Sequence, residues 1–352
     1  MPLPFSSPPN SLCILRLSAV GDICHTLPVV RTLQAAGPQT RLIWIIGKTE
    51  SSLVSDIPGI EFVVFDKSQG WRAYPSVKTA LKGRRFDALL HMQMSLRSSL
   101  INRLVNTDIR LGFDRARAKD LQWLVNNHHI PSHGRQHVMD SLFGFAEALG
   151  ITERQVTWDI PISQQDKDTV DALIPQHRPL LVISPCSSMS YRNWNANGYA
   201  AVGDYAVAHY GMVVVLSGGP SAMEQQMGAQ IEHHMQQKPL NLIGKTNLKQ
   251  LLHLLSKAAV LLSPDSGPAH MATAVRTPVI GLYACTNPER ARPYFSAAST
   301  VDKYHDAVQK KYGKPASELP WGIRIRDAGT MDTINASDVT EKLDVIMERL
   351  GE

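Results

Sequence analysis

The chain's architecture follows from one stretch near the amino terminus, Ile14-Leu-Arg-Leu-Ser-Ala-Val-Gly-Asp-Ile-Cys-His-Thr-Leu-Pro28. It predicts a buried strand over 12–17, a turn of small residues over 18–21 and a helix that begins near Asp22. A strand that leads through such a turn into a helix places the turn at the carboxyl end of a parallel sheet, where open α/β folds bind ligands. Asp22 is therefore either a carboxylate beside a ligand or a helix cap.

The same alternation of strand and helix continues along the chain. Apolar, β-branched runs predict further strands at 42–46, 62–65, 88–92, 180–184, 212–216, 260–262 and 278–283. Helical spacing of apolar residues predicts helices at 26–36, 77–81, 137–149, 199–209, 222–235, 246–258 and 268–275. We predict an α/β protein with two Rossmann-like domains, whose parallel sheets face each other across a cleft.

The predicted domain boundaries follow from the places where this alternation stops and restarts. Pro and Ser dominate the first ten residues, a polar connector lies at about 152–178, and the last helix is amphipathic. We assign a flexible tail to 1–10, a first domain to 11–165, a second domain to 166–335 and a helix to 336–352. We expect this last helix to pack back on the first domain.

The composition excludes several classes of protein. Of 352 residues, 43% are hydrophobic and 19% are charged, which suits two separate cores. The net charge of +5 suits an anionic ligand or membrane face, but no zinc-finger spacing or aromatic-basic repeat indicates nucleic acid. Four scattered cysteines indicate a reducing compartment. Without a signal pattern or an apolar run of about 18 residues, we expect a cytoplasmic protein with no transmembrane segment.

A second motif, Leu262-Ser-Pro-Asp-Ser-Gly-Pro-Ala-His270, repeats the strand–turn–helix pattern in the second half. Gly267 permits a tight turn, and Pro268 takes the first helical position that proline prefers. The free N–H groups of this helix start form an anion site, and His270 lies in its first turn. The alternative is a capped loop that binds nothing.

Two further loops of the second half carry candidate ligand groups. Ser187, Ser188 and Arg192 follow the strand at 180–184, and an arginine offers paired donors to phosphate oxygens. Glu224 follows the glycines of Leu216-Ser-Gly-Gly-Pro220, where it binds a ligand or caps a helix. Neither loop matches the glycine patterns of dinucleotide or P-loop sites.

Other suggestive residues have simpler explanations. Asp166-Lys-Asp168 resembles a metal-binding D-x-D but lies at a helix start, where acidic residues are favoured by the dipole. Cys24 and His25 are adjacent in a helix and so do not face each other. The basic residues around Gly112-Phe-Asp114 form a solvated face or meet an acceptor's phosphates; they include Arg115, Arg117 and Lys119.

Several motifs, in the same order, resemble those of the lipopolysaccharide heptosyltransferases, glycosyltransferase family 9. The resemblance extends from about Leu12 to Tyr294. It rests on Gly21-Asp-Ile-Cys-His-Thr-Leu-Pro28, Gly112-Phe-Asp114, Gly244-Lys-Thr246, and Asp265-Ser-Gly-Pro-Ala-His270 with Thr277-Pro-Val-Ile280. It implies a GT-B fold with the acceptor on the first domain and the nucleotide sugar on the second. It also implies ADP-heptose as donor and Kdo–lipid A, at the inner-membrane face, as acceptor.

The resemblance also assigns roles to residues. Asp22 matches the catalytic base, Arg192 a residue at the donor diphosphate, and Glu224 an acid at the donor nucleoside. The remaining donor assignments are Ser187, Ser188, Asp265, Ser266, Gly267 and His270, and the acceptor assignments are His25, Arg115, Arg117 and Lys119. No metal or cofactor is implied. The family often has a Lys near Arg16 and a hydroxyl residue near Ala19, and it offers no match for 303–326, which we connect with acceptor specificity.

The function expected on these grounds is inverting transfer of heptose to a Kdo hydroxyl, with Asp22 as general base. One alternative is a heptosyltransferase that adds a later heptose or modifies a protein. Another is a noncatalytic protein that binds a nucleotide sugar on the same scaffold. A dehydrogenase is disfavoured because its dinucleotide fingerprint is missing.

Overall fold

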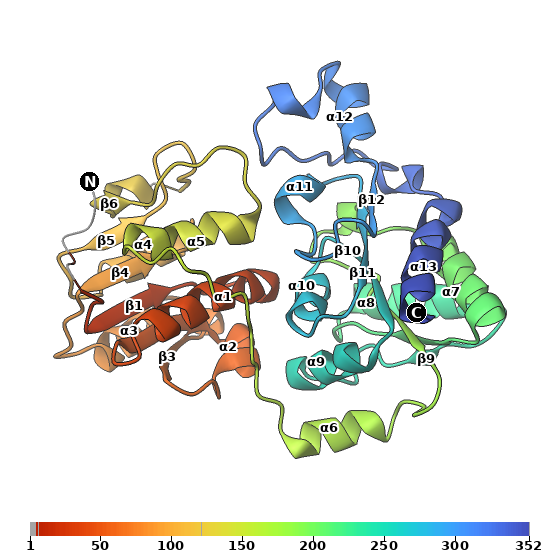
Figure 1. Cartoon of the computed structure of the whole chain (residues 1–352), viewed down its shortest axis with the longest axis horizontal. Coiled ribbons are helices and arrows are strands. Elements are labelled where there is room, and N and C mark those ends of the chain that lie inside the picture. The colour runs from red at the N-terminus through yellow and green to blue at the C-terminus, as the bar shows by residue number, and fades with distance from the viewer. Residues whose placement is uncertain (1–4, 6, 121, 352) are drawn as a thin grey trace. The chain divides into compact units, whose positions relative to one another are not determined.

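The computed structural model describes residues 5, 7–120 and 122–351, and the chain divides between Pro161 and Ile162 into two compact units. The first runs from red to yellow and the second from green to blue in Figure 1. The sequence placed this division at 165/166. The predicted flexible tail, 1–10, lies partly outside the described residues. Its end is held in place, since Thr40 donates to the carbonyl of Pro9 and the N–H of Arg41 to that of Asn10.

The first unit is built on one six-stranded sheet in the order β3-β2-β1-β4-β5-β6, with every neighbouring pair parallel. Its strands are β1 (Ser11–Leu15), β2 (Arg41–Gly47), β3 (Ile60–Phe65), β4 (Ala88–His91), β5 (Arg110–Gly112) and β6 (His128–His129). Its helices are α1 (Val20–Ala36), α2 (Lys48–Val54), α3 (Ala73–Ala80), α4 (Leu96–Asn102) and α5 (Val138–Ala148). The predicted alternation is confirmed, and the continuous apolar runs of β1 and β4 are buried throughout because both strands lie inside the sheet.

The second unit repeats this plan, with the order β12-β11-β10-β7-β8-β9. Its strands, all parallel to their neighbours, are β7 (Leu180–Ile183), β8 (Val213–Leu216), β9 (Leu240–Asn241), β10 (Val260–Pro264), β11 (Val279–Tyr283) and β12 (Thr300–Asp302). Its helices are α6 (Gln164–Asp171), α7 (Ala196–Tyr210), α8 (Ala222–His234), α9 (Leu248–Lys257), α10 (Gly267–Ala274), α11 (Pro288–Ala291), α12 (Tyr304–Tyr312) and α13 (Ala336–Gly351).

Each sheet has a point at which the chain reverses its direction of winding. In the first sheet β1 lies between β2 and β4, and in the second β7 lies between β8 and β10. Ligands of open α/β sheets bind at this topological switch point, beyond the carboxyl ends of the strands. The loops that follow β1 and β4, and those that follow β7 and β10, are therefore the places to look for a site.

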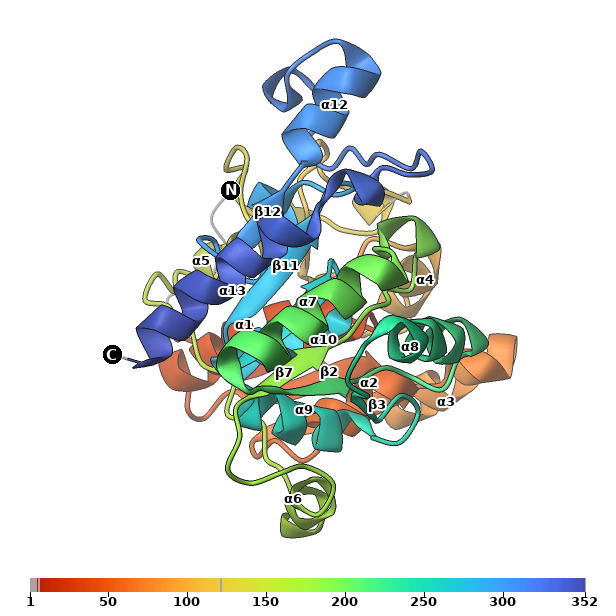
Figure 2. The ribbon, with the colours of Figure 1, turned by 90° about the vertical axis from the view of Figure 1, so that its right-hand side faces the viewer.

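The final helix, α13, packs in the core of the second unit; that it also returns to the first domain stays a prediction. Figure 2 shows it beside α7. Val339, Leu343 and Ile346 are buried in the core of the second unit, and the hydroxyl of Tyr210 donates to Asp344 at 2.6 Å. Amphipathic spacing shows that one face of the helix is buried, but it does not show which unit covers that face.

Candidate active site

Asp22 lies in the first turn of α1, just beyond the end of β1. Its Oδ2 atom accepts the backbone N–H of Ala19 at 3.1 Å and lies 2.6 Å from Nη2 of Arg16. The side chain is nevertheless 37% exposed. Asp22 therefore caps the helix start and also presents its carboxylate at the surface, so the two roles suggested by the sequence do not exclude each other.

The loop that carries Asp22 is fixed across the switch point. Arg16 is buried, and its guanidinium donates to the carbonyl of Ser18 at 3.1 Å and to the carbonyl of Met92, which follows β4. The side chain of Gln93 accepts the N–H of Leu17 at 2.6 Å and donates to the hydroxyl of Ser18 at 3.2 Å. The sequence did not indicate a role for Gln93, because nothing local shows that β4 lies beside β1.

A cluster of buried polar side chains forms hydrogen bonds at the end of β4. The His91 ring is fully buried, with Nδ1 3.2 Å from Oδ1 of Asn126 and Nε2 3.0 Å from the hydroxyl of Ser98. Burial lowers the pKa of His91 from its ordinary value of 6.5 to about 4. Gln122, also buried, donates to the carbonyls of His91 and Gln93. The loop that follows β4 thus begins beside a buried imidazole that is neutral at pH 7.

His25, which we expected to touch the acceptor, is 5% exposed and packs edge-on against the ring of His137. It lies one turn beyond Asp22 and is among the buried residues of α1. The structure therefore does not bring His25 to the surface where Asp22 lies. Nor does Cys24 offer a nucleophile, since burial raises the pKa of its thiol to about 12.

The predicted basic residues follow β5, at the same carboxyl edge of the sheet as Asp22, but they differ in availability. The guanidinium of Arg117 pairs with Asp114 and donates to the Ser141 hydroxyl at 2.9 Å and to the Pro131 carbonyl at 2.7 Å. Arg117 is therefore committed to holding its own loop. Arg115, stacked 5.2 Å from the Trp123 ring, and Lys119 are exposed.

In the second unit, the predicted donor residues gather at the ends of β7 and β10. Nη1 of Arg192 lies 3.1 Å from Oδ2 of Asp265, and Nε2 of His270 lies 3.9 Å from the other carboxylate oxygen. The Asp265 side chain is only 13% exposed. Burial alone raises its pKa, but the nearby His270 ring and the charge of Arg192 more than offset this and hold the pKa below its ordinary value.

The start of α10 has no side-chain cap. Ser266 is its N-cap residue but makes no side-chain cap hydrogen bond, because its hydroxyl bonds to that of Ser263 at 2.7 Å. Gly267 begins the helix, and the first-turn N–H groups of a helix point toward its amino end. Arg192 lies beside this helix start. Together they offer the hydrogen-bond donors and the positive electrostatic potential that a diphosphate site needs.

The other predicted donor residues are engaged within their own loops. The hydroxyl of Ser187 donates to the Met189 carbonyl at 2.9 Å, whereas Ser188 is exposed. Glu224 closes the loop after β8, accepting the N–H of Gly219 at 2.7 Å and the hydroxyl of Ser221 at 2.6 Å. A Cβ atom on Gly219 would lie 3.0 Å from Glu224, so the glycine permits this close approach.

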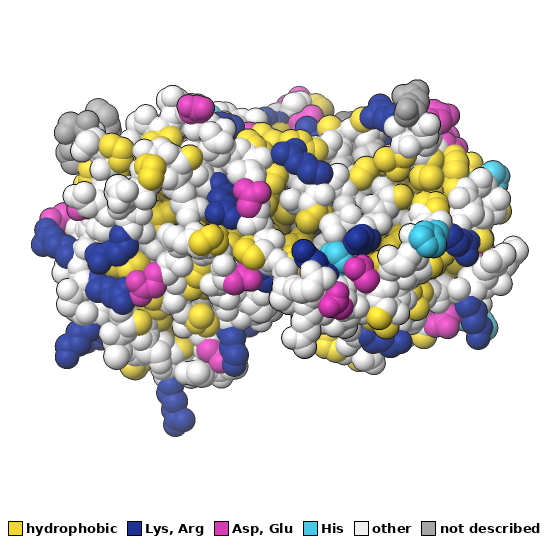
Figure 3. All heavy atoms as spheres, turned by 60° about the horizontal axis from the view of Figure 1, so that its bottom comes forward, with side chains coloured by type: hydrophobic (Ala, Val, Ile, Leu, Met, Phe, Trp, Pro, Cys, Tyr) yellow, Lys and Arg dark blue, Asp and Glu magenta, His cyan; other side chains and the backbone are white. Residues whose placement is uncertain are grey.

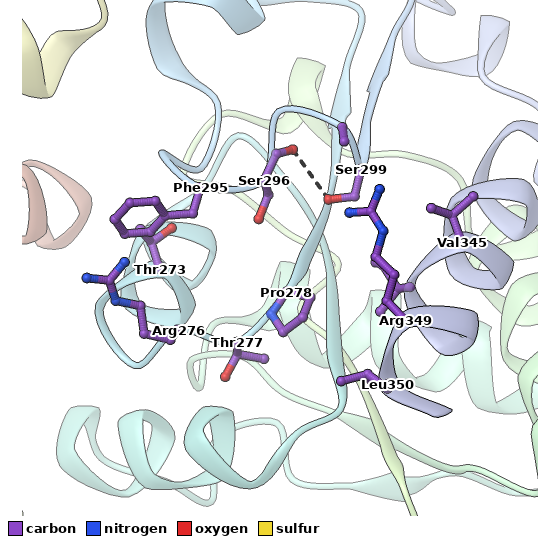
Figure 4. A pocket seen from close by; sticks show the side chains of 12 residues that line it. Thr273, Arg276, Thr277, Pro278, Phe295, Ser296, Ser299, Val345, Arg349 and Leu350 are labelled. Carbon is purple, nitrogen blue, oxygen red and sulfur yellow. Dashed lines mark hydrogen bonds between the residues drawn. The ribbon is translucent and has the colours of Figure 1, made fainter. Parts of the chain in front are cut away.

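A pocket of about 340 Å³ lies at the opposite edge of the second sheet, between the end of α10, the loop before β12 and the end of α13. Figure 4 shows Arg276 beside Phe295, with Arg349 entering from α13. None of the predicted donor residues lines this pocket, so it is separate from the candidate site.

Surface charge and metal-ligand patterns add little to this site. On the face in Figure 3, lysine and arginine side chains are interspersed with acidic ones. Among residues 5, 7–120 and 122–351, no three His, Cys, Asp or Glu side chains are grouped as a metal site. Within the same residues, every helix is too short or too polar to cross a membrane.

Comparison with known proteins shows what the chain is similar to. A sequence model of glycosyltransferase family 9 (heptosyltransferase) matches residues 75–322. The lipopolysaccharide core heptosyltransferase OpsX of Haemophilus influenzae is 42% identical over 351 residues, covering 100% of this chain and 99% of that protein. A family 9 glycosyl transferase from Veillonella parvula has a TM-score of 0.79 at 19% identity, with 97% of both chains covered. Escherichia coli heptosyltransferase WaaC with ADP has a TM-score of 0.70 at 18% identity, with 96% of this chain and 99% of that chain covered.

Proposed function

The chain belongs to glycosyltransferase family 9, and we propose that it moves L-glycero-D-manno-heptose from ADP-heptose to a Kdo residue of the lipopolysaccharide inner core. It is a glycosyltransferase with a GT-B fold. The name of the Haemophilus relative supports a lipopolysaccharide core acceptor, and the ADP held by the Escherichia coli structure supports an ADP-linked donor. The motifs shared with the family support heptose as the sugar.

The observation that carries the chemical proposal is the exposed carboxylate of Asp22 on a clamped loop. Arg16 and Gln93 hold this loop from two neighbouring strand ends, so the carboxylate has a defined position at the switch point. A general base needs both properties, access to the reacting hydroxyl and a fixed geometry. The family match covers residues 75–322 and so does not bear on Asp22 itself.

In the proposed reaction, the acceptor hydroxyl oxygen attacks the anomeric carbon of the donor as the bond from that carbon to the diphosphate oxygen breaks. Asp22 takes the proton of the hydroxyl, and the configuration at the anomeric carbon is inverted. The electron pair of the broken bond stays with ADP, which leaves with added negative charge. Arg192 and the start of α10 stabilise this charge electrostatically, so the proposal needs no metal.

We place the enzyme in the cytoplasm, working at the inner face of the membrane. The acceptor is a lipid, so the enzyme must reach it at the bilayer surface. Arg115 and Lys119 are exposed at the carboxyl edge of the first sheet, where they offer cations to an anionic acceptor. Arg117 is left out of this role because its own loop occupies its donors.

The decisive experiment incubates the purified full-length chain with ADP-heptose and, separately, with Kdo–lipid A or with its heptosylated product. We expect a mass increase of one heptose on Kdo–lipid A alone. Transfer only to the heptosylated product would assign the enzyme to a later step. ADP-heptose binding without transfer to any acceptor would favour a noncatalytic role.

A further inference from the structure

The segment 303–326, which matches no family motif, forms an excursion from the carboxyl edge of the second sheet. It leaves after β12, forms α12 and returns, standing out from its unit in Figures 1 and 2. Tyr304, Val308 and Ile325 are buried in a small core of its own, and the Tyr304 hydroxyl donates to the Ile323 carbonyl at 3.0 Å. The excursion is therefore a packed element with a defined return path.

Its return limb is attached to the loop that follows β11. The N–H of Ile325 donates to the carbonyl of Cys285 at 2.9 Å, and Arg324 forms an antiparallel bridge with Thr286. In such extended backbone, alternate side chains point to opposite faces. Because Ile325 is buried, Arg324 and Arg326 share the other face and are exposed.

That face borders the candidate donor site. Arg324 lines a small hollow together with Asp265, Asn287 and Arg290. The guanidinium carbon of Arg326 lies 5.8 Å from the centre of the Tyr191 ring, and that of Arg192 lies 5.6 Å from the same ring.

The pKa of Tyr191 is also consistent with several positive charges close to its ring. Burial alone raises its pKa, but Arg192, Arg324 and Arg326 contribute to an overall lowering. Two arginines from the excursion and one from the loop after β7 thus act on one side chain. Asp327 follows the pair but is engaged by Lys311 at 2.7 Å. Of these three arginines, Arg192 is paired with Asp265, so the group retains excess positive charge.

We propose that Arg324 and Arg326 bind the diphosphate of the nucleotide-sugar donor together with Arg192. This inference rests on the proposed function and moves the excursion from the acceptor specificity we first expected to the donor side. The matched family segment ends at residue 322, before either arginine. A diphosphate diester is doubly negative and gains charge when the sugar departs, which suits several guanidinium groups offering paired donors.

The test compares binding of ADP and AMP by calorimetry, without acceptor, for the full chain and for Arg324→Gln, Arg326→Gln and the double variant. We expect each single change to weaken ADP binding by about tenfold or more, as lost charge-assisted hydrogen bonds do. AMP binding should change much less, because AMP lacks the second phosphate. Lys310→Gln, an exposed change on the same excursion, is the matched control and should bind ADP as the parent does.

The outcomes separate this inference from the wider proposal. If the parent chain binds no ADP, both are overturned. If the parent binds ADP and the double variant binds it equally well, only the role of the two arginines is overturned, and a raised KM for Kdo–lipid A would then return the excursion to the acceptor. Arg326→Lys provides a second measurement should a Gln variant misfold, and a partial recovery of ADP affinity relative to Arg326→Gln is expected.

Discussion

The two switch points of this molecule share a topology and an Asp–Arg pair, but they differ in how far the carboxylate is exposed. At the first, the carboxylate of Asp22 is 37% exposed and its loop is held largely by Gln93 and Arg16. At the second, the Asp265 side chain is 13% exposed and lies beside Arg192 and the His270 ring. One strand order can thus present a carboxylate that is partly open to solvent or one that is almost enclosed. The loops, and not the sheets, decide which it is.

The largest effect should come from removing the exposed carboxylate of the first switch point. Asp22→Asn keeps an oxygen for the Ala19 N–H but removes the proton acceptor. We expect turnover to fall by about 10²–10⁴ while ADP affinity stays as in the parent chain. Steady-state rates and calorimetry measure the two quantities. Near-parental turnover would remove Asp22 from the mechanism.

The first switch point should also be the more sensitive to acid. The folded pKa of His91 is about 4, below its ordinary value of 6.5, so the unfolded chain binds a proton that the folded chain does not between these values. The free energy of unfolding should fall by up to about 3 kcal/mol as the pH drops from 6.5 to 4, and should not change through this group above 6.5. Urea unfolding of the full chain at several pH values measures this. His91→Gln should flatten the profile; an equally steep profile in that variant would contradict the assignment.

At the second switch point, Arg192→Gln should weaken ADP binding by about ten- to a hundredfold, because a charged partner of the diphosphate is lost. The change also removes a positive charge beside the buried carboxylate of Asp265, so the fold of the variant should be checked by thermal melting. Arg276→Gln is the control, since Arg276 lines the pocket at the opposite edge of the same sheet. Equal losses in both variants would show that general charge, and not the site, governs binding.

The smallest expected effect concerns metal removal. Because guanidinium groups and the start of α10 are proposed to stabilise the leaving ADP, transfer should be unchanged after exhaustive dialysis against EDTA. If activity is lost and Mg²⁺ restores it, a metal ion stabilises the leaving ADP. The contrast between the two switch points would then be weaker.

Much of the architecture is local in origin and could therefore be predicted. The apolar runs and glycine turns predicted both halves of the fold, and the motifs around Asp22 and Asp265 indicated where loops meet the sheet edges. The relation of Gln93 to Leu17 could not be predicted, because it depends on which strands are neighbours.

Other features depend on packing partners that the sequence does not specify. His25 lies on the buried side of its helix, although its place in the motif suggested contact with a ligand. The return of the excursion to the loop after β11 joins Ile325 to Cys285 across a long loop, and no periodic pattern marks such a bond.

The burial of α13 in the core of the second unit has a consequence for biosynthesis. Val339, Leu343 and Ile346 are synthesised after strands β7 to β12, yet the second unit needs them to complete its core. The first unit, by contrast, ends at Pro161 and can fold while the ribosome is still translating. The core of the second unit therefore stays incomplete in the nascent chain until α13 has left the ribosome.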